Sequence, residues 1–447
     1  MEATLRIGRN RPSAIQHGLQ AQFSVAKFLS RVFANRSVLL MIDQGCNSLW
    51  GFVLGAIIAR WSSIGVFGTF AMVMAVYYVT SAAVASMTTS IVAVDAARLD
   101  KARQAFLFHA RRAAERLALP PILLGVGILW LVHPAIGEDP ISAAVIGSIY
   151  VSINVLVDVR RRFLGIGAQA AHLAAASVAR TGGLAFSAAV GWAFFESDQR
   201  LLFVVLVALL LSAVHFVGLG AIAKRLPTPS RNLGTIAIIR QFRLGIWLFG
   251  SAIATSAFEQ GVAIYSGAAG GPEITGGWRA GSYLFAFIGL LSQLIELMLP
   301  DYLTRWLGRR PTSRALGVYV LASASVAASA SFVIAIANAH IWLPYLGDSY
   351  KDYAYVSYWY GLIFTCIMTR TAIMPFLKTT RPQEIFAASL LANVVGLVAF
   401  ALTPEISAWT ICVVGFSVNA TSLLVNSLSL SIISARNSNC LSASAKG

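Results

Sequence analysis

The chain has 447 residues, of which 57% are hydrophobic and only 12% are charged, and its mean hydropathy is +0.73. Soluble domains carry about 25% charged residues, so this composition excludes an ordinary soluble protein. The net charge of +16 could indicate nucleic acid binding. Because the basic residues lie beside apolar segments, attraction to the anionic lipid of an inner leaflet explains them better, and no nucleic acid partner is expected.

Twelve apolar segments are long enough to cross a membrane core of about 30 Å as helices. The predicted spans of the first half are 38–59, 64–94, 117–136, 141–159, 171–195 and 201–223. Those of the second half are 244–268, 280–299, 315–337, 353–377, 385–403 and 408–433. Two further helices are expected outside the membrane core: residues 21–36 form an interfacial helix, and residues 95–116 form a cytoplasmic amphipathic helix.

The connectors between these spans alternate between a set rich in Lys and Arg and a set that contains few of them. All but five of the 34 lie in the two tails or in every second connector. The exceptions are Arg60, Arg200, Arg279 and Lys351 in the opposite connectors and Arg180 within an apolar segment. Basic connectors stay in the cytoplasm, so both termini are expected to be cytoplasmic.

The two halves of the chain contain a weak internal duplication. Residues 134–138 (PAIGE) resemble residues 344–348 (PYLGD), and residues 43–45 (DQG) resemble residues 259–261 (EQG). Both halves would begin inside, so the repeat is parallel, and two such lobes can rock about a cavity between them. We therefore predict an all-α membrane protein with two pseudo-symmetric six-helix lobes. Its predicted parts are a tail with the interfacial helix at 1–37, lobes at 38–223 and 244–433, a cytoplasmic linker at 224–243 and a tail at 434–447.

Three stretches resemble a known family. They are residues 43–71, with a glycine-led second helix, residues 160–164, and residues 346–354, where Gly347 and Tyr350 form a Gly-x-x-Tyr motif. In these stretches the chain resembles the polysaccharide-biosynthesis flippases of the multidrug/oligosaccharidyl-lipid/polysaccharide exporter superfamily. The first half departs from the pattern, because it has Glu-Asp-Pro in place of the motif tyrosine.

The resemblance implies a function. Members of that family carry polyprenyl-diphosphate-linked oligosaccharides from the inner to the outer leaflet of the bacterial inner membrane by alternating access. They use a V-shaped cavity lined largely by spans 1, 2, 7 and 8. The expected partners are the lipid-linked glycan, membrane lipid and the polysaccharide polymerase and chain-length machinery.

A lipid diphosphate requires positive charge in a wet cavity, and guanidinium groups match phosphate with paired donors. The candidate ligands are Arg60, Arg180, Arg279 and Arg370. The alternative for Arg60 and Arg279 is contact with the outer headgroups, and for Arg370 with the inner ones. The alternative for Arg180 is a structural ion pair with Asp43 or with the glutamate at position 259.

Other polar residues within the spans are candidates for sugar contact or ion coupling. The candidate sugar contacts are Gln44, Asn47, Ser256 and Gln260, with hydrogen bonds between helices as the alternative. The candidates for binding a coupling proton or sodium ion are Asp43, Glu259 and Glu296, with pairing to a nearby Arg as the alternative. No other cofactor is expected, and no spacing of histidines indicates a metal site.

Two rival functions can be weighed against a flippase. An ion-coupled multidrug or metabolite antiporter of the same superfamily would have the same fold, but its cavity would be rich in acids to bind cations. A membrane-embedded polymerase or glycosyltransferase would need catalytic groups on a large outer loop. The longest expected outer segment, 338–352, contains no paired-acid motif. The sequence therefore predicts a transporter and not an enzyme.

Overall fold

The computed structural model describes residues 36–88, 103–135, 139–166, 169–224, 258–286, 313–380, 382–403 and 405–444. Within these residues every regular element is a helix, and nine helices are long and apolar enough to cross a membrane. The prediction of an all-α multi-pass membrane protein is confirmed. The interfacial helix, the linker and parts of spans 7 and 8 lie outside the described residues, so the count of twelve spans, the domain boundaries and the cytoplasmic termini stay predictions.

The helices of the first half follow the predicted spans closely. They are α2 (Arg36–Trp61), α3 (Ile64–Met87), α5 (Arg103–Leu117), α6 (Leu119–Val132), α7 (Pro140–Ile166), α8 (Ala170–Phe194) and α9 (Ser197–Lys224). The expected amphipathic helix is α5: Leu107 and Ala110 are buried on one face, whereas Arg112 and Arg116 are exposed.

The second half contains four short helical elements that the sequence did not predict. Its elements are α11 (Phe258–Gly270), α12 (Pro272–Gly281), α14 (Ser313–Ala337), the π-helix η3 (Asn338–Trp342), α15 (Leu343–Leu346), the 3-10 helix η4 (Asp348–Tyr353), α16 (Ala354–Thr380), α17 (Pro382–Ala401) and α18 (Ala408–Ser444). The four that the sequence did not predict are α12, η3, α15 and η4.

Three boundaries differ from the prediction in ways that matter for the site. α7 continues to Ile166, so residues 160–162 lie within a membrane-spanning helix and not in a connector. The expected outer connector before residue 280 contains α12, which follows α11 after a single turn residue, Gly271, at φ 101. The expected outer segment 338–352 is helical for most of its length.

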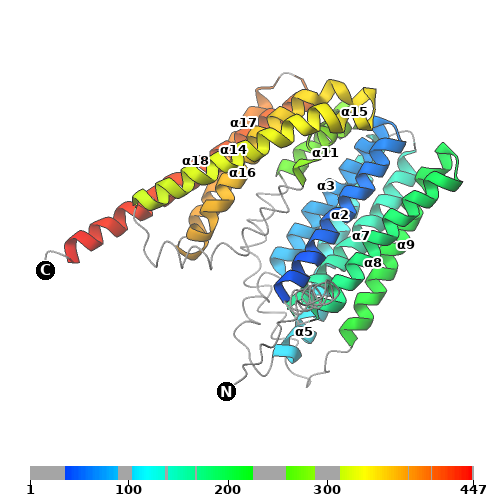
Figure 1. Cartoon of the computed structure of the whole chain (residues 1–447), viewed down its shortest axis with the longest axis horizontal. Coiled ribbons are helices and arrows are strands. Elements are labelled where there is room, and N and C mark those ends of the chain that lie inside the picture. Colours follow the sequence, from blue (N-terminus) through cyan, green and yellow to red (C-terminus); the bar gives the residue numbers. More distant parts are fainter. Residues whose placement is uncertain are drawn as a thin grey trace, which may run out of the picture.

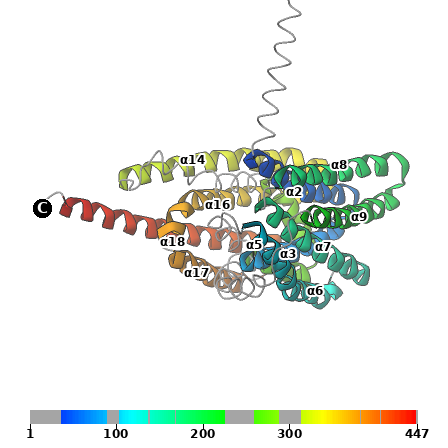
Figure 2. The ribbon, with the colours of Figure 1, turned by 90° about the horizontal axis from the view of Figure 1, so that it is seen from below.

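The helices form two groups that meet at one end and diverge toward the other (Figure 1). One group contains α2, α3, α7, α8 and α9, and the other contains α14, α16, α17 and α18. α12 packs against α3 and so joins the second half to the first at the end where the groups meet. In both views α18 continues past its neighbours and carries the C-terminus away from the bundle (Figure 2).

At the closed end α3 of the first half and α12 of the second half approach each other through glycine. A Cβ on Gly68 of α3 would lie 1.7 Å from the carbonyl oxygen of Pro272, and a Cβ on Gly276 of α12 would lie 2.2 Å from that of Ile64. Any side chain larger than hydrogen would separate the helices there, so the two backbones pack directly against each other.

Two tyrosines of the second half bind backbone carbonyls of α2 at the same end. The Tyr350 hydroxyl donates to the carbonyl of Ala59 at 3.1 Å, and the Tyr283 hydroxyl donates to that of Phe52. The Tyr283 ring also stacks on Trp342, with centroids 5.7 Å apart. The tyrosine of the Gly-x-x-Tyr motif therefore holds the two halves together.

The glycine contact predicts the effect of one methyl group. Gly276→Ala should keep the closed end from forming, because its Cβ would clash with the carbonyl of Ile64. Spin labels at Glu196 and Ser349, both exposed near this end, should report a longer distance in the variant by electron paramagnetic resonance. Gly127→Ala is the matched control, because no atom lies within 4 Å of a Cβ placed there. An unchanged distance in Gly276→Ala would contradict the assigned contact.

Candidate substrate cavity

A cavity of about 550 Å³ lies between the two groups of helices. One wall comes from α2, α3 and α7, and the other comes from α11, α12, the residues that follow α12, α16 and α18. The expected cavity between lobes is therefore present. Its described lining includes helices α7, α16 and α18, which the resemblance did not name.

Four of the candidate ligands line this cavity. Gln44 and Asn47 lie on α2, Gln260 on α11 and Arg279 on α12. Arg279 was predicted to be a cavity ligand, with contact to the outer headgroups as the alternative. It is part of the cavity lining, with its guanidinium carbon 5.7 Å from the centroid of the Tyr78 ring across the gap.

The three other arginine candidates lie elsewhere. Arg60 is exposed at the end of α2, 5.8 Å from the ring centroid of Tyr345. Arg370 donates from Nη1 to Ser422 Oγ at 3.0 Å, which joins α16 to α18. Neither residue is part of the cavity lining.

Arg180 is buried behind the cavity wall. Its side chain is 5% exposed, donates to Asn154 Oδ1 and, at 3.0 Å, to Ser212 Oγ, and lies 3.9 Å from the ring centroid of Trp50. Asn154 and Trp50 line the cavity, whereas Arg180 does not. Its neighbours are thus neutral groups rather than the acids that the sequence suggested as partners. The structure places Arg180 where it supports the wall.

Of the three candidate acids, only Asp43 can be placed. It is 4% exposed, accepts a hydrogen bond from Ser177 Oγ at 2.6 Å and forms an ion pair with Arg161 at 2.7 Å. The side chain of Glu259 and the whole of Ser256 and Glu296 lie outside the described residues. Their predicted roles stay predictions.

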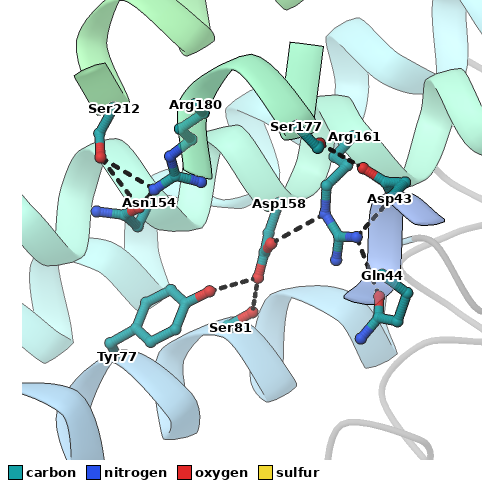
Figure 3. A network of polar contacts seen from close by, with 10 residues as sticks. All are labelled: Asp43, Gln44, Tyr77, Ser81, Asn154, Asp158, Arg161, Ser177, Arg180 and Ser212. Carbon is teal, nitrogen blue, oxygen red and sulfur yellow. Dashed lines mark hydrogen bonds and ion pairs between the residues drawn. The ribbon is translucent and has the colours of Figure 1, made fainter. Parts of the chain in front are cut away.

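Arg161 is the centre of a buried polar network (Figure 3). Its Nη1 donates to Asp43 Oδ2 at 2.7 Å and to Gln44 Oε1 at 3.0 Å, and its Nε lies 3.5 Å from Asp158 Oδ1. The side chains of Arg161 and Asp43 are each 5% exposed. Burial without these partners would be costly for either charge, so the network stabilises the buried charges of this wall.

Asp158 connects this network to α3. Its Oδ2 accepts from the hydroxyl of Tyr77 at 2.7 Å and from Ser81 Oγ at 2.8 Å. Asp158 and Arg161 lie one turn apart on α7 and therefore share a face of that helix. The three helices α2, α3 and α7 are thus held in fixed positions along one side of the cavity.

The sequence did not identify Arg161, Arg162 or Asp158 as site residues. Arg161 and Arg162 were assigned to a cytoplasmic connector because a run of three arginines normally ends a span, and Asp158 was placed at the end of the span 141–159 without a role. One signal was available: Asp158 precedes Arg161 by three residues, and Asp43 occurs in the first span, so buried acids could compensate a buried Arg. The neighbouring Arg160 pairs with Glu115 of α5 at 2.8 Å, outside the cavity lining.

Two cationic side chains remain available to a ligand. Arg162 on α7 and Arg279 on α12 line the cavity from opposite walls. Within the described residues neither forms a salt bridge. The described lining contains one further Arg, Arg161, and one acid, Asp158, which pair with each other. The described part of the lining therefore carries a net positive charge.

No protein-family model matches the chain, and no curated protein matches it. Its fold is nevertheless similar to that of solved transporters. The lipid II flippase MurJ in an inward closed conformation aligns with a TM-score of 0.60 at 12% identity, over 88% of this chain and 87% of that chain.

Two conformations of a multidrug resistance MATE family transporter of the MOP superfamily are also similar. The inward-facing structure aligns with a TM-score of 0.56 at 14% identity, over 92% of this chain and 99% of that chain. The outward-facing structure aligns with a TM-score of 0.56 at 15% identity, over 91% of this chain and 96% of that chain. The chain therefore has the transporter fold that MATE transporters and MurJ share.

The buried ion network predicts a stability effect. Arg161→Met should destabilise the protein by about 3–5 kcal/mol, because it leaves two buried carboxylates without their cation. The measurement is chemical or thermal unfolding of the purified protein in lipid nanodiscs. Adding Asp43→Asn should recover part of the loss. Lys351→Met is the control, since it removes an ion pair with Asp348 that lies at the exposed surface. Equal stability of the parent and Arg161→Met would show that the network does not stabilise the folded protein.

Proposed function

We propose that the protein moves a polyprenyl-diphosphate-linked oligosaccharide from the inner to the outer leaflet for surface polysaccharide biosynthesis. The two groups of helices would expose the cavity alternately to either side. The proposed membrane is the inner membrane of a bacterium, and the polymerase and chain-length machinery are the proposed partners.

The observation that supports this proposal is the pair of arginines on opposite walls. Arg162 and Arg279 each present a guanidinium group to one cavity, and within the described chain neither forms an ion pair with a carboxylate. A diphosphate carries about two negative charges and accepts paired N–H donors. A site with this charge favours a lipid diphosphate and disfavours a cationic drug.

Outward movement of such an anion has a driving force in the membrane potential. Moving one charge across the membrane corresponds to ~2.3 kcal/mol per 100 mV, and an interior-negative potential favours the export of anions. A coupling proton or sodium ion is therefore not required. Asp43, the candidate for that role whose side chain can be placed, is already bonded to Arg161 and Ser177.

A second candidate function is favoured by the similarity to MATE transporters. An ion-coupled antiporter for cationic drugs would need carboxylates that can bind the drug or the coupling ion. Asp158 in the described lining and Asp43 behind it are instead both within 3.5 Å of Arg161. This pairing makes the antiporter the weaker of the two proposals.

Gene deletion and complementation test the proposal without knowledge of the glycan. Deletion should abolish surface polysaccharide and leave lipid-linked repeat units on the inner leaflet, and the parent gene should restore export. The double variant Arg162→Gln with Arg279→Gln should lower export about tenfold or more, because it removes two charge-assisted contacts to phosphate. Arg116→Gln, at an exposed position on α5, is the matched control and should complement fully.

Two results would count against the proposal. One is normal surface polysaccharide after deletion in a host without a paralogue. The other is full complementation by the double variant at equal protein abundance. A deletion strain that becomes sensitive to cationic dyes while its polysaccharide stays normal would favour the antiporter.

A further inference from the structure

One aromatic ring in the cavity is open to a ligand. Among the aromatic side chains of the described lining, Tyr78 is the most exposed, at 38%, whereas its neighbour Tyr77 is 8% exposed. Successive residues of a helix point in different directions. Tyr77 therefore packs into the wall and binds Asp158, while Tyr78 faces the cavity.

The position of Tyr78 is fixed from two sides. Its ring centroid lies 5.3 Å from that of Tyr77, and its hydroxyl lies 3.9 Å from the point that a Cβ on Gly51 would occupy. The hydroxyl thus reaches toward α2 beside a glycine that leaves room for it. A ring held in this way loses little further freedom when a ligand binds.

The groups around the ring are donors and acceptors suited to hydroxyls. Asn47 and Ser48 on α2, one turn from Gly51, line the same cavity, and Gln260 and Ser282 line it from the other half. Arg279 approaches the Tyr78 ring from that half, 5.7 Å from the ring centroid. An aromatic face bordered by amides, hydroxyls and a guanidinium group fits a sugar ring.

The order of groups along the cavity agrees with the chemical order of a lipid-linked sugar. The Tyr77 side chain contacts α7 at two levels, because its ring lies 6.1 Å from that of Tyr150 and its hydroxyl binds Asp158 at 2.7 Å. Arg162 lies four residues beyond Asp158, roughly 6 Å further along the helix axis and away from the closed end. The cation thus lies toward the open side and the aromatic ring toward the closed end.

We propose that Tyr78 is the platform on which the sugar next to the diphosphate stacks, so that it selects glycan-bearing lipid over bare lipid diphosphate. The apolar C–H face of a pyranose would lie on the negative face of the ring, and its hydroxyls would bond the surrounding polar groups. Arg162 would hold the diphosphate on the side of the open end. This inference rests on the proposed function, because it places a sugar in the same cavity.

Binding of two defined probes tests the inference. The probes are farnesyl diphosphate and farnesyl diphosphate linked to a single glucose, titrated into the purified full chain in nanodiscs. The parent should bind the glucose-bearing probe more tightly. Tyr78→Leu should weaken that probe about tenfold and change farnesyl diphosphate less than about twofold, because leucine keeps apolar bulk but lacks the π face. Tyr78→Phe should retain most of the preference.

Matched variants separate the inference from the proposed function. Arg162→Gln should weaken both probes alike, because both carry the diphosphate. Tyr358→Leu changes an exposed tyrosine that is not part of the cavity lining and should leave both affinities unchanged. Unfolding midpoints confirm that each variant is folded.

Three outcomes would overturn the role of Tyr78. They are equal binding of both probes by the parent, an equal loss of both probes in Tyr78→Leu, and no loss of either in that variant. If Arg162→Gln still weakens both probes in that case, Arg162 binds the diphosphate but Tyr78 does not bind the sugar. If Arg162→Gln changes the affinity of neither probe, the cavity does not bind a diphosphate and the proposed function is contradicted.

Discussion

The buried guanidinium of Arg161 is the interaction on which the cavity depends. Its contacts with Asp43 and Asp158 join α2 to α7, and the hydrogen bonds of Asp158 extend the connection to α3. Charges in a membrane protein are stable only when such partners are correctly placed. The same geometry that satisfies Arg161 directs the next residue, Arg162, into the cavity, so one residue provides the framework and its neighbour is free for a ligand.

The two ends of the molecule are held by different kinds of contact. The wall around Arg161 depends on charge, whereas the closed end depends on backbone packing at Gly68 and Gly276 and on hydrogen bonds from Tyr283 and Tyr350 to carbonyls. A neutral hydrogen bond contributes about 0.5–1.5 kcal/mol net, so the closed end can separate without breaking a buried ion pair. This difference suits a protein whose halves move while each wall keeps its form.

Hydropathy predicted the helical fold because any segment that crosses lipid must satisfy its backbone internally. Hydropathy also misplaced the site, because the three arginines at 160–162 were interpreted as the end of a span. α7 continues through these residues, and Asp43 and Asp158 compensate the charge of Arg161. Residues 272–281 contain three glycines and two charges, which is typical of a loop, and only the contact with α3 shows why a helix forms there. Long-range pairing of this kind is not visible in local composition.

The placement of Arg162 and Arg279 on opposite walls links binding to movement under the proposed function. In an empty cavity the two like charges repel each other, which favours separation of the walls on that side. A diphosphate that contacts both would replace this repulsion with attraction and draw the walls together. A ligand shifts a conformational equilibrium only through its differential affinity for the two states. Two arginines on separate walls supply such a difference, because only one conformation lets both contact the anion. Two arginines on the same wall would bind the anion equally well in either conformation.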